Sequence, residues 1–189
     1  MPHSKRETLT LRYYSDVRRA VLQNLPLGPQ TLPALLDRSR DVDATIRKLV
    51  YTHVLEKYCH PSDFGQVGFT HPRALSIAQR EMIVRNGLGD REESVKAAAA
   101  QLLGQWVDVV RSDGSKKEED GEAVKKEVGE ETIEDLVAFL KLFDLAEGTV
   151  AEDALGSVFD TRVDIFEHIE FPGTLPSSSQ RARTLAHKR

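Results

Sequence analysis

The side chains best suited to binding a metal lie in one stretch of the sequence. They are three histidines and the single cysteine, namely His53, Cys59, His60 and His71. A zinc site usually takes two ligands from one turn, with C-x2-C or H-x3-H spacing, so that both converge on the ion. Here Cys59 and His60 are adjacent, and the other two lie well away from them. The spacing argues against a metal and favours His53 on a helix face with the other residues in a loop.

Residues that could carry out catalysis do not form a recognisable set. The paired carboxylates Glu92-Glu93 and Glu130-Glu131 lie in charged stretches, without the apolar pocket that would raise a carboxyl pKa. No GxxxxGK, GxGxxG, GxSxG or HExxH motif is present. The sequence therefore predicts a protein that is not an enzyme, with no cofactor, no metal and no small-molecule substrate.

Basic residues are the remaining candidates for a functional site. Seven of them could form a stripe that contacts the phosphates of double-stranded DNA without reading its sequence: Arg18, Arg19, Arg47, Lys48, Arg73, Arg80 and Arg85. A second interpretation is structural. The same side chains could pair with aspartates of neighbouring repeats, in ladders formed by Asp16, Asp41, Asp43 and Asp90.

The element that must position these residues is a helical hairpin over residues 73–110. Its first helix covers residues 74–84, and Asn86-Gly87-Leu88-Gly89 is expected to break it, with glycines free to take left-handed conformations. Its second helix covers residues 94–110, with apolar residues at 3.6-residue spacing and four consecutive alanines. Two such helices cannot bury their apolar faces alone, so they must stack on another pair.

The second helix of this hairpin has two counterparts upstream. When Val17, Ile46 and Val95 are aligned, the next position is basic in each copy, and small or aliphatic residues follow four and eight positions later. The copies are 29 and 49 residues apart, and the longer gap contains an insertion at residues 59–72. An underlying period of about 30 to 47 residues is typical of helical solenoids. The pattern predicts an all-α HEAT-repeat solenoid of stacked antiparallel helix pairs, and a coincidental run of amphipathic helices is the alternative.

The chain divides into five parts on this interpretation. Residues 1–12 are a frayed N-terminus, and residues 13–110 are HEAT-like repeats interrupted by the loop at 59–72. Residues 111–130 are a charged, disordered loop with too few apolar side chains to fold. Residues 131–171 form a further HEAT-like helix pair, and residues 172–189 are a disordered tail.

Composition indicates the class of protein. A single cysteine excludes an intramolecular disulfide and suits a reducing compartment. No stretch approaches the roughly 18 apolar residues of a membrane span, and the first residues lack the apolar segment of a signal peptide. An intracellular protein without membrane contact is expected. The formal charge of −4 is uneven, because residues 1–111 hold 16 basic and 12 acidic residues whereas residues 112–189 hold 10 and 18.

Ordered blocks of residues resemble a known family. The blocks that carry the resemblance are Asp16–Leu22, Thr31–Pro33, Arg40–Ala44, Arg47–Tyr51, Arg73–Arg80, Gly87–Arg91, Val95-Lys96 and Gln105-Trp106. With these blocks in this order, the chain resembles the CAP-G family of HEAT-repeat condensin subunits from Tyr14 to Val110, and more weakly from Thr132 to Glu170. This chain resembles only an internal part of the long family solenoid.

The resemblance implies a non-catalytic scaffold of condensin. Such a subunit binds the kleisin chain, and through it the SMC subunits, together with double-stranded DNA. It works on chromosomes in the nucleus during mitotic condensation, and ATP hydrolysis belongs to the SMC partners. The competing hypothesis is a generic HEAT or armadillo adaptor that binds a peptide and ignores DNA.

Overall fold

A computed structural model describes residues 3–60, 68–115 and 128–166. All regular secondary structure in these ranges is helical, which confirms the all-α prediction. In chain order the elements are α1 (His3–Asn24), α2 (Leu32–Leu36), the 3-10 turn η1 (Asp37–Arg40), α3 (Ala44–Leu49), the π-helical turn η2 (Val50–Leu55), α4 (Ile77–Leu88), α5 (Glu93–Ser115), α6 (Val128–Leu140), α7 (Thr149–Thr161) and α8 (Val163–Phe166).

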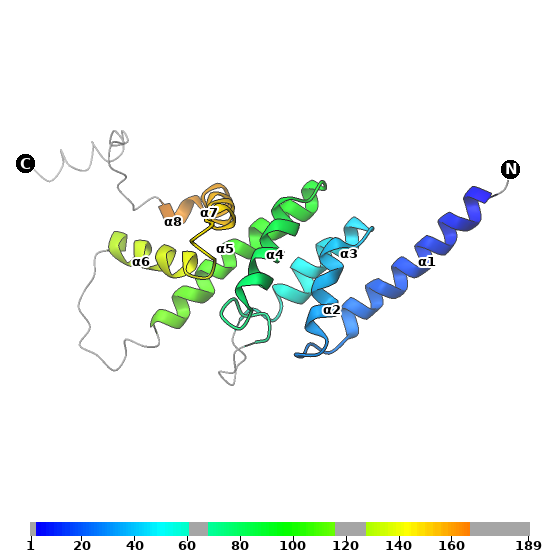
Figure 1. The fold of residues 1–189 in the computed structure, drawn as a ribbon, viewed down its shortest axis with the longest axis horizontal. Coiled ribbons are helices and arrows are strands. Elements are labelled where there is room, and N and C mark those ends of the chain that lie inside the picture. The colour runs from blue at the N-terminus through cyan, green and yellow to red at the C-terminus, as the bar shows by residue number, and fades with distance from the viewer. Residues whose placement is uncertain (1–2, 61–67, 116–127, 167–189) are drawn as a thin grey trace, which may run out of the picture.

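The helices stack in a row, as a solenoid requires (Figure 1). Helix α1 packs on α3 and η2, α3 packs on α5, and α5 packs on α6 and α7. Each stretch of chain therefore contacts chiefly its neighbours along the row. The row is elongated, with α1 at one end and α6, α7 and α8 at the other (Figure 1).

Local signals set the helix starts. Ser76 caps α4 by accepting from the Gln79 amide at 3.2 Å, and the Gln79 side chain accepts from the Ser76 amide at 2.9 Å. This reciprocal pair satisfies two amides that the first turn leaves without partners. Asp43 caps α3 by accepting from the Thr45 amide at 2.8 Å.

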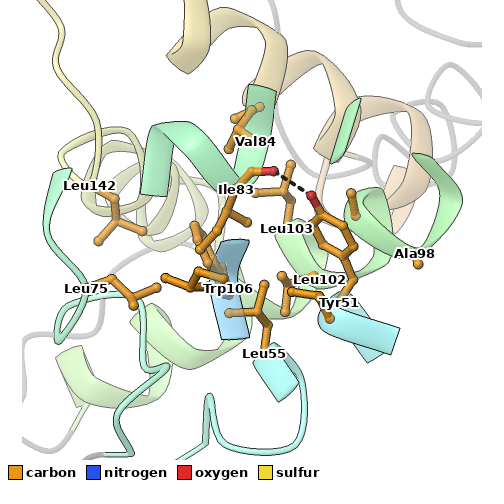
Figure 2. Close-up of a cluster of buried hydrophobic side chains, with 14 of the residues drawn as sticks. Tyr51, Leu55, Leu75, Ile83, Val84, Ala98, Leu102, Leu103, Trp106 and Leu142 are labelled. Atoms are coloured by element: carbon orange, nitrogen blue, oxygen red, sulfur yellow. Dashed lines mark hydrogen bonds between the residues drawn. The ribbon is translucent and has the colours of Figure 1, made fainter. Parts of the chain in front are cut away.

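The core is continuous along the row and is centred on α5 (Figure 2). Trp106 and Tyr51 are its largest fully buried side chains. The Tyr51 hydroxyl donates to the Ile83 carbonyl at 3.1 Å, so its polar end is satisfied inside the apolar cluster. Burial raises the pKa of Tyr51, which keeps the phenol neutral and able to donate.

The expected glycine break at the end of the first hairpin helix is wrong. Helix α4 continues through Gly87 to Leu88, and Gly148 is the only described residue with a positive φ. A Cβ at Gly87 would lie 2.4 Å from the Ala99 Cβ and 2.9 Å from the Tyr51 ring. Gly87 is therefore used for close packing of α4 on α5, and not for a left-handed turn. The helix also begins at Ile77, later than predicted, because turns occupy residues 68–75.

The first described helix overlaps the segment predicted to be frayed. Helix α1 begins at His3, and its sequence to Asn24 contains no glycine or proline that would interrupt it. Its apolar side is buried at Leu22 but not at Val17. Val17 is 46% exposed, whereas its counterparts Ile46 and Val95 are fully buried. The predicted equivalence of these three positions fails at Val17, because the described residues provide helices on only one side of α1.

The other predicted boundaries fall close to described elements. Helix α5 extends to Ser115 and α6 begins at Val128, so the two ends of the predicted 111–130 loop are helical. Three stretches of the predicted divisions lie outside the described residues: 116–127, the part of the insertion at 61–67, and the predicted tail. Helices α6 and α7 follow in the predicted order, but each packs chiefly on α5, and α7 also packs on α4.

Candidate functional site

Arg18 on α1 makes the first long-range ion pair of the solenoid. Its Nε and Nη2 atoms donate to the two carboxylate oxygens of Asp41 at 2.8 and 2.9 Å. Asp41 lies in the turn just before α3 and also accepts from the Asp43 amide at 3.0 Å. A two-bond arginine–carboxylate pair fixes orientation as well as distance, so it holds α1 against the start of the next repeat.

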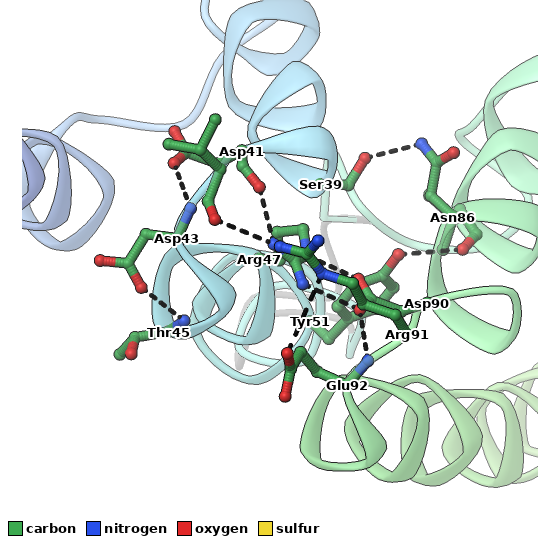
Figure 3. A network of polar contacts seen from close by, with 12 residues as sticks. Ser39, Asp41, Asp43, Thr45, Arg47, Tyr51, Asn86, Asp90, Arg91 and Glu92 are labelled. Atoms are coloured by element: carbon green, nitrogen blue, oxygen red, sulfur yellow. Dashed lines mark hydrogen bonds and ion pairs between the residues drawn. The ribbon is translucent and has the colours of Figure 1, made fainter.

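Arg47 repeats this arrangement one repeat further on (Figure 3). Its Nε and Nη2 atoms donate to Asp90 at 2.6 and 2.9 Å, and its Nη1 donates to the Asp41 carbonyl at 2.8 Å. Asp90 precedes α5 and accepts in addition from the Glu92 amide at 2.8 Å. The two side chains are only 7% and 5% exposed.

Electrostatics keep this buried pair charged. The hydrogen bonds from Arg47 hold the pKa of Asp90 below its ordinary value, and those to Asp90 raise the pKa of Arg47. The ladder interpretation is therefore correct for Arg18 and Arg47. The Nε and Nη2 donors of both guanidinium groups are committed to an aspartate of the next repeat, and the Arg47 side chain is buried as well.

Arg80 is also used inside the structure. Its Nη1 donates to the Pro72 and Leu75 carbonyls at 2.6 and 2.8 Å, and the residue is buried. It ties the turns before α4 to the helix itself. Desolvation lowers its pKa, yet an arginine remains charged in proteins.

Four predicted DNA contacts remain on the surface. Arg19 and Lys48 each lie one residue after a ladder arginine. Lys48 is exposed, and Arg19 is partly exposed, 3.7 Å from Asp16. Arg73 is exposed in the turns before α4. Arg85 is exposed on α4 and donates to Glu81 at 3.2 Å. On each of the two helices, the ladder arginine and the more exposed basic residue are therefore consecutive: Arg18 and Arg19, and Arg47 and Lys48.

Two further exposed arginines, Arg40 and Arg91, were not predicted as part of a site. Together with Arg85 they line a hollow of about 470 Å³ between the turn before α3 and the turn before α5. Arg40 is next to the ladder aspartate Asp41 in the sequence, and Arg91 is next to Asp90. This adjacency could have indicated that the two arginines lie close together, because the ladder joins the turns that contain them.

The metal-capable residues do not converge. The Nε2 of His53 lies 3.3 Å from the Gln23 carbonyl, and buried Cys59 donates through Sγ to the Glu56 carbonyl at 3.0 Å. Across the described ranges, no three His, Cys, Asp or Glu side chains are grouped so that they could hold a metal ion. Nor does any described helix have the length and apolar character needed to span a membrane.

Stacked helix pairs joined by an arginine–aspartate ladder place the chain among the HEAT-type α-solenoids. No family model matches it. Condensin complex subunit 3 of Schizosaccharomyces pombe is 38% identical over 160 residues, which are 84% of this chain and 14% of that protein. The human protein of the same name is 40% identical over 93 residues, covering 49% of this chain and 8% of its own length.

A solved structure agrees with the sequence comparison. The S. pombe condensin Cnd3-Cnd2 subcomplex contains a chain with a TM-score of 0.60 and 36% identity, covering 84% of this chain and 17% of that one. The chain belongs to the condensin complex subunit 3 family. It spans about one-seventh of the length of the S. pombe relative.

Proposed function

We propose that this chain is a non-catalytic HEAT-repeat scaffold segment of condensin that contacts a kleisin and double-stranded DNA. It would act on chromosomes in the nucleus during mitotic condensation, with SMC subunits reached through the kleisin. The observation that carries the proposal is the family relationship over most of the chain, together with a solenoid whose repeats are joined by the Arg18–Asp41 and Arg47–Asp90 pairs. The Cnd3-Cnd2 subcomplex supports the kleisin part, since Cnd3 is the related chain in it.

Contact with DNA is assigned to the exposed basic positions. Arg19 and Lys48 occupy the same helical phase on successive second helices, so they lie one repeat apart on the same side of the solenoid. Spaced positive charges of this kind suit phosphates and carry no base specificity. Arg18, Arg47 and Arg80 are left out of this proposal because each already donates to the protein, and Arg47 and Arg80 are buried.

Titration of duplex DNA at two salt concentrations tests the DNA part. Phosphate contacts release counterions, so affinity must fall steeply between about 50 and 200 mM salt. The variant Arg19→Glu/Lys48→Glu is expected to weaken binding at low salt by at least tenfold. A control with the same charge change at distant exposed lysines, Lys57→Glu/Lys141→Glu, is expected to lose far less. No binding at low salt, or equal loss in both variants, would remove DNA from the proposal.

A kleisin-binding experiment distinguishes the scaffold proposal from the adaptor hypothesis. Crosslinking and co-immunoprecipitation with a Cnd2-type kleisin should recover this chain if the scaffold role is correct. Kleisin binding without DNA binding would favour a protein–protein adaptor. Absence of kleisin binding by a chain with intact helical circular dichroism would contradict the scaffold proposal itself.

A further inference from the structure

The hollow beside the ladder has the composition of an anion site. It lies where the turn at Asp41-Val42 faces the turn at Gly89-Asp90-Arg91, and three exposed guanidinium groups line it, those of Arg40, Arg85 and Arg91. Asn86 and Ser39 form part of its wall and are joined by a hydrogen bond of 2.9 Å (Figure 3). This hydrogen bond and the Arg47–Asp90 pair therefore hold the wall in place without a ligand.

The carboxylates in the wall do not cancel these charges. Asp90 is bound to Arg47. Asp41 is bound to Arg18 and lies 3.4 Å from Arg38, and neither of these two arginines lines the hollow. Among the described residues the Arg40 side chain meets no carboxylate, and Arg91 reaches only Glu92 at 3.9 Å. Each guanidinium has five N–H donors, so most donors of Arg40 and Arg91 are left to solvent or to a ligand.

We propose that the hollow binds a single phosphate monoester, carried on a serine or threonine of a peptide segment of a partner protein. A phosphorylated side chain brings a charge of about −2 and three acceptor oxygens, which suit a cluster of arginines. Two-bond contacts from guanidinium groups to phosphate are among the stronger hydrogen bonds available on a protein surface.

The surroundings favour one phosphate over a polyanion. Glu147, which is 77% exposed, lies 3.8 Å from Arg85, and Glu92 and Glu81 are close to Arg91 and Arg85. A DNA duplex would bring several phosphates against these carboxylates, whereas one phosphate can sit between the arginines. This site is therefore separate from the DNA contact proposed for Arg19 and Lys48.

The lining also favours a peptide over a nucleotide. Val42 is its only large apolar side chain, and no aromatic ring is present on which a base could stack. Val42 is 79% exposed, so it offers an apolar contact to a residue next to the phosphorylated one. An extended peptide can use this contact, while a free phosphate cannot.

The experiment compares four probes on the full chain by isothermal titration calorimetry. They are inorganic phosphate, a nine-residue peptide with a central phosphoserine followed by leucine, its unphosphorylated counterpart, and a short DNA duplex. We expect the phosphopeptide to bind at least tenfold more tightly than inorganic phosphate and the unphosphorylated peptide. The duplex should bind equally well to the wild type and to Arg40→Gln/Arg91→Gln, because its proposed contacts are Arg19 and Lys48. NMR shifts of the arginine Nε–H groups should identify Arg40, Arg85 and Arg91.

Matched variants locate the binding. Arg40→Gln/Arg91→Gln changes only exposed side chains, so the helical circular dichroism should be preserved and phosphopeptide binding should fall at least tenfold. Lys57→Gln/Lys141→Gln removes the same charge elsewhere and should leave binding unchanged. Equal binding of the two peptides overturns the proposal, as does phosphate alone binding as tightly as the phosphopeptide. A duplex that binds most tightly and loses affinity in Arg40→Gln/Arg91→Gln would make the hollow a nucleic-acid site instead.

Discussion

Arg47 and Asp90 are 43 residues apart in the sequence and joined by two hydrogen bonds in the structure, at 2.6 and 2.9 Å. Arg18 and Asp41 repeat the relationship one step earlier. In each case an arginine on the second helix of one repeat binds the aspartate that precedes the second helix of the next. The repeats are thereby held in register by charge as well as by apolar contact.

Removing one partner of the inner pair should be strongly destabilising. Arg47→Ala leaves the Asp90 carboxylate buried without its cation, and we expect a loss of about 3–5 kcal/mol in the free energy of unfolding. Urea unfolding followed by the fluorescence of Trp106, the single and fully buried tryptophan, measures it. Arg18→Ala is the comparison and should cost less, because the Arg18 side chain is 27% exposed. A loss below about 1 kcal/mol in Arg47→Ala would show that the pair does not hold the repeats together.

The same pair predicts how stability depends on pH. The folded pKa of Asp90 is lower than its unfolded value, so the unfolded chain binds more protons in acid. The contribution of Asp90 is fully present above about pH 5 and is lost as the pH falls through about 4 to the lower folded pKa. We expect the free energy of unfolding to fall over this window. In the double variant Arg47→Met/Asp90→Leu, which removes both charges, the free energy of unfolding should fall less over this window. The same pH dependence in the variant and the wild type would show that Asp90 does not cause the fall.

The close approach of α4 and α5 gives a packing prediction. Gly87→Ala would place a methyl group 2.4 Å from the Ala99 Cβ, so α4 must shift. We expect a loss of about 1–3 kcal/mol in the free energy of unfolding, measured in urea.

A second glycine provides the control. Gly156 lies inside α7 with open space around its Cβ position. Gly156→Ala should stabilise the chain by about 0.5–1 kcal/mol, because alanine has the higher helix propensity. If both alanine substitutions stabilised the protein, the tight contact between α4 and α5 would be refuted.

The rate at which the buried Cys59 thiol is labelled measures how readily the structure around it opens. Burial raises the pKa of its thiol to about 11, so about one molecule in a thousand carries the reactive thiolate at pH 8. Labelling of the native chain with a thiol reagent should be at least a hundredfold slower than labelling in urea. As Cys59 is the only cysteine, the rate reports this site alone. Rapid labelling of the native protein would show that the segment between η2 and α4 opens easily.

The main elements could be predicted because their signals are local. The spacing of apolar residues and the alanine run define α5, and the charged residues after the aligned positions gave Arg18 and Arg47 as ladder candidates. The end of α4 could not be predicted in this way. Glycine is used both to end helices and to let helices approach, and only the neighbouring Ala99 and Tyr51 distinguish these roles at Gly87.

The candidate site was predicted only in part for a similar reason. All seven arginines and lysines look alike in the sequence, but the structure commits Arg18, Arg47 and Arg80 to internal contacts. Arg40 and Arg91 gain a shared environment only because the ladder brings two distant turns together.

By itself the sequence determined the helical class, the approximate repeat and the family resemblance, because periodicity and ordered blocks are properties of the chain as written. Which basic side chains are exposed was decided by tertiary structure alone. An arginine becomes structural or accessible according to the carboxylates and carbonyls that folding places beside it, as Asp90 is placed beside Arg47 from 43 positions away.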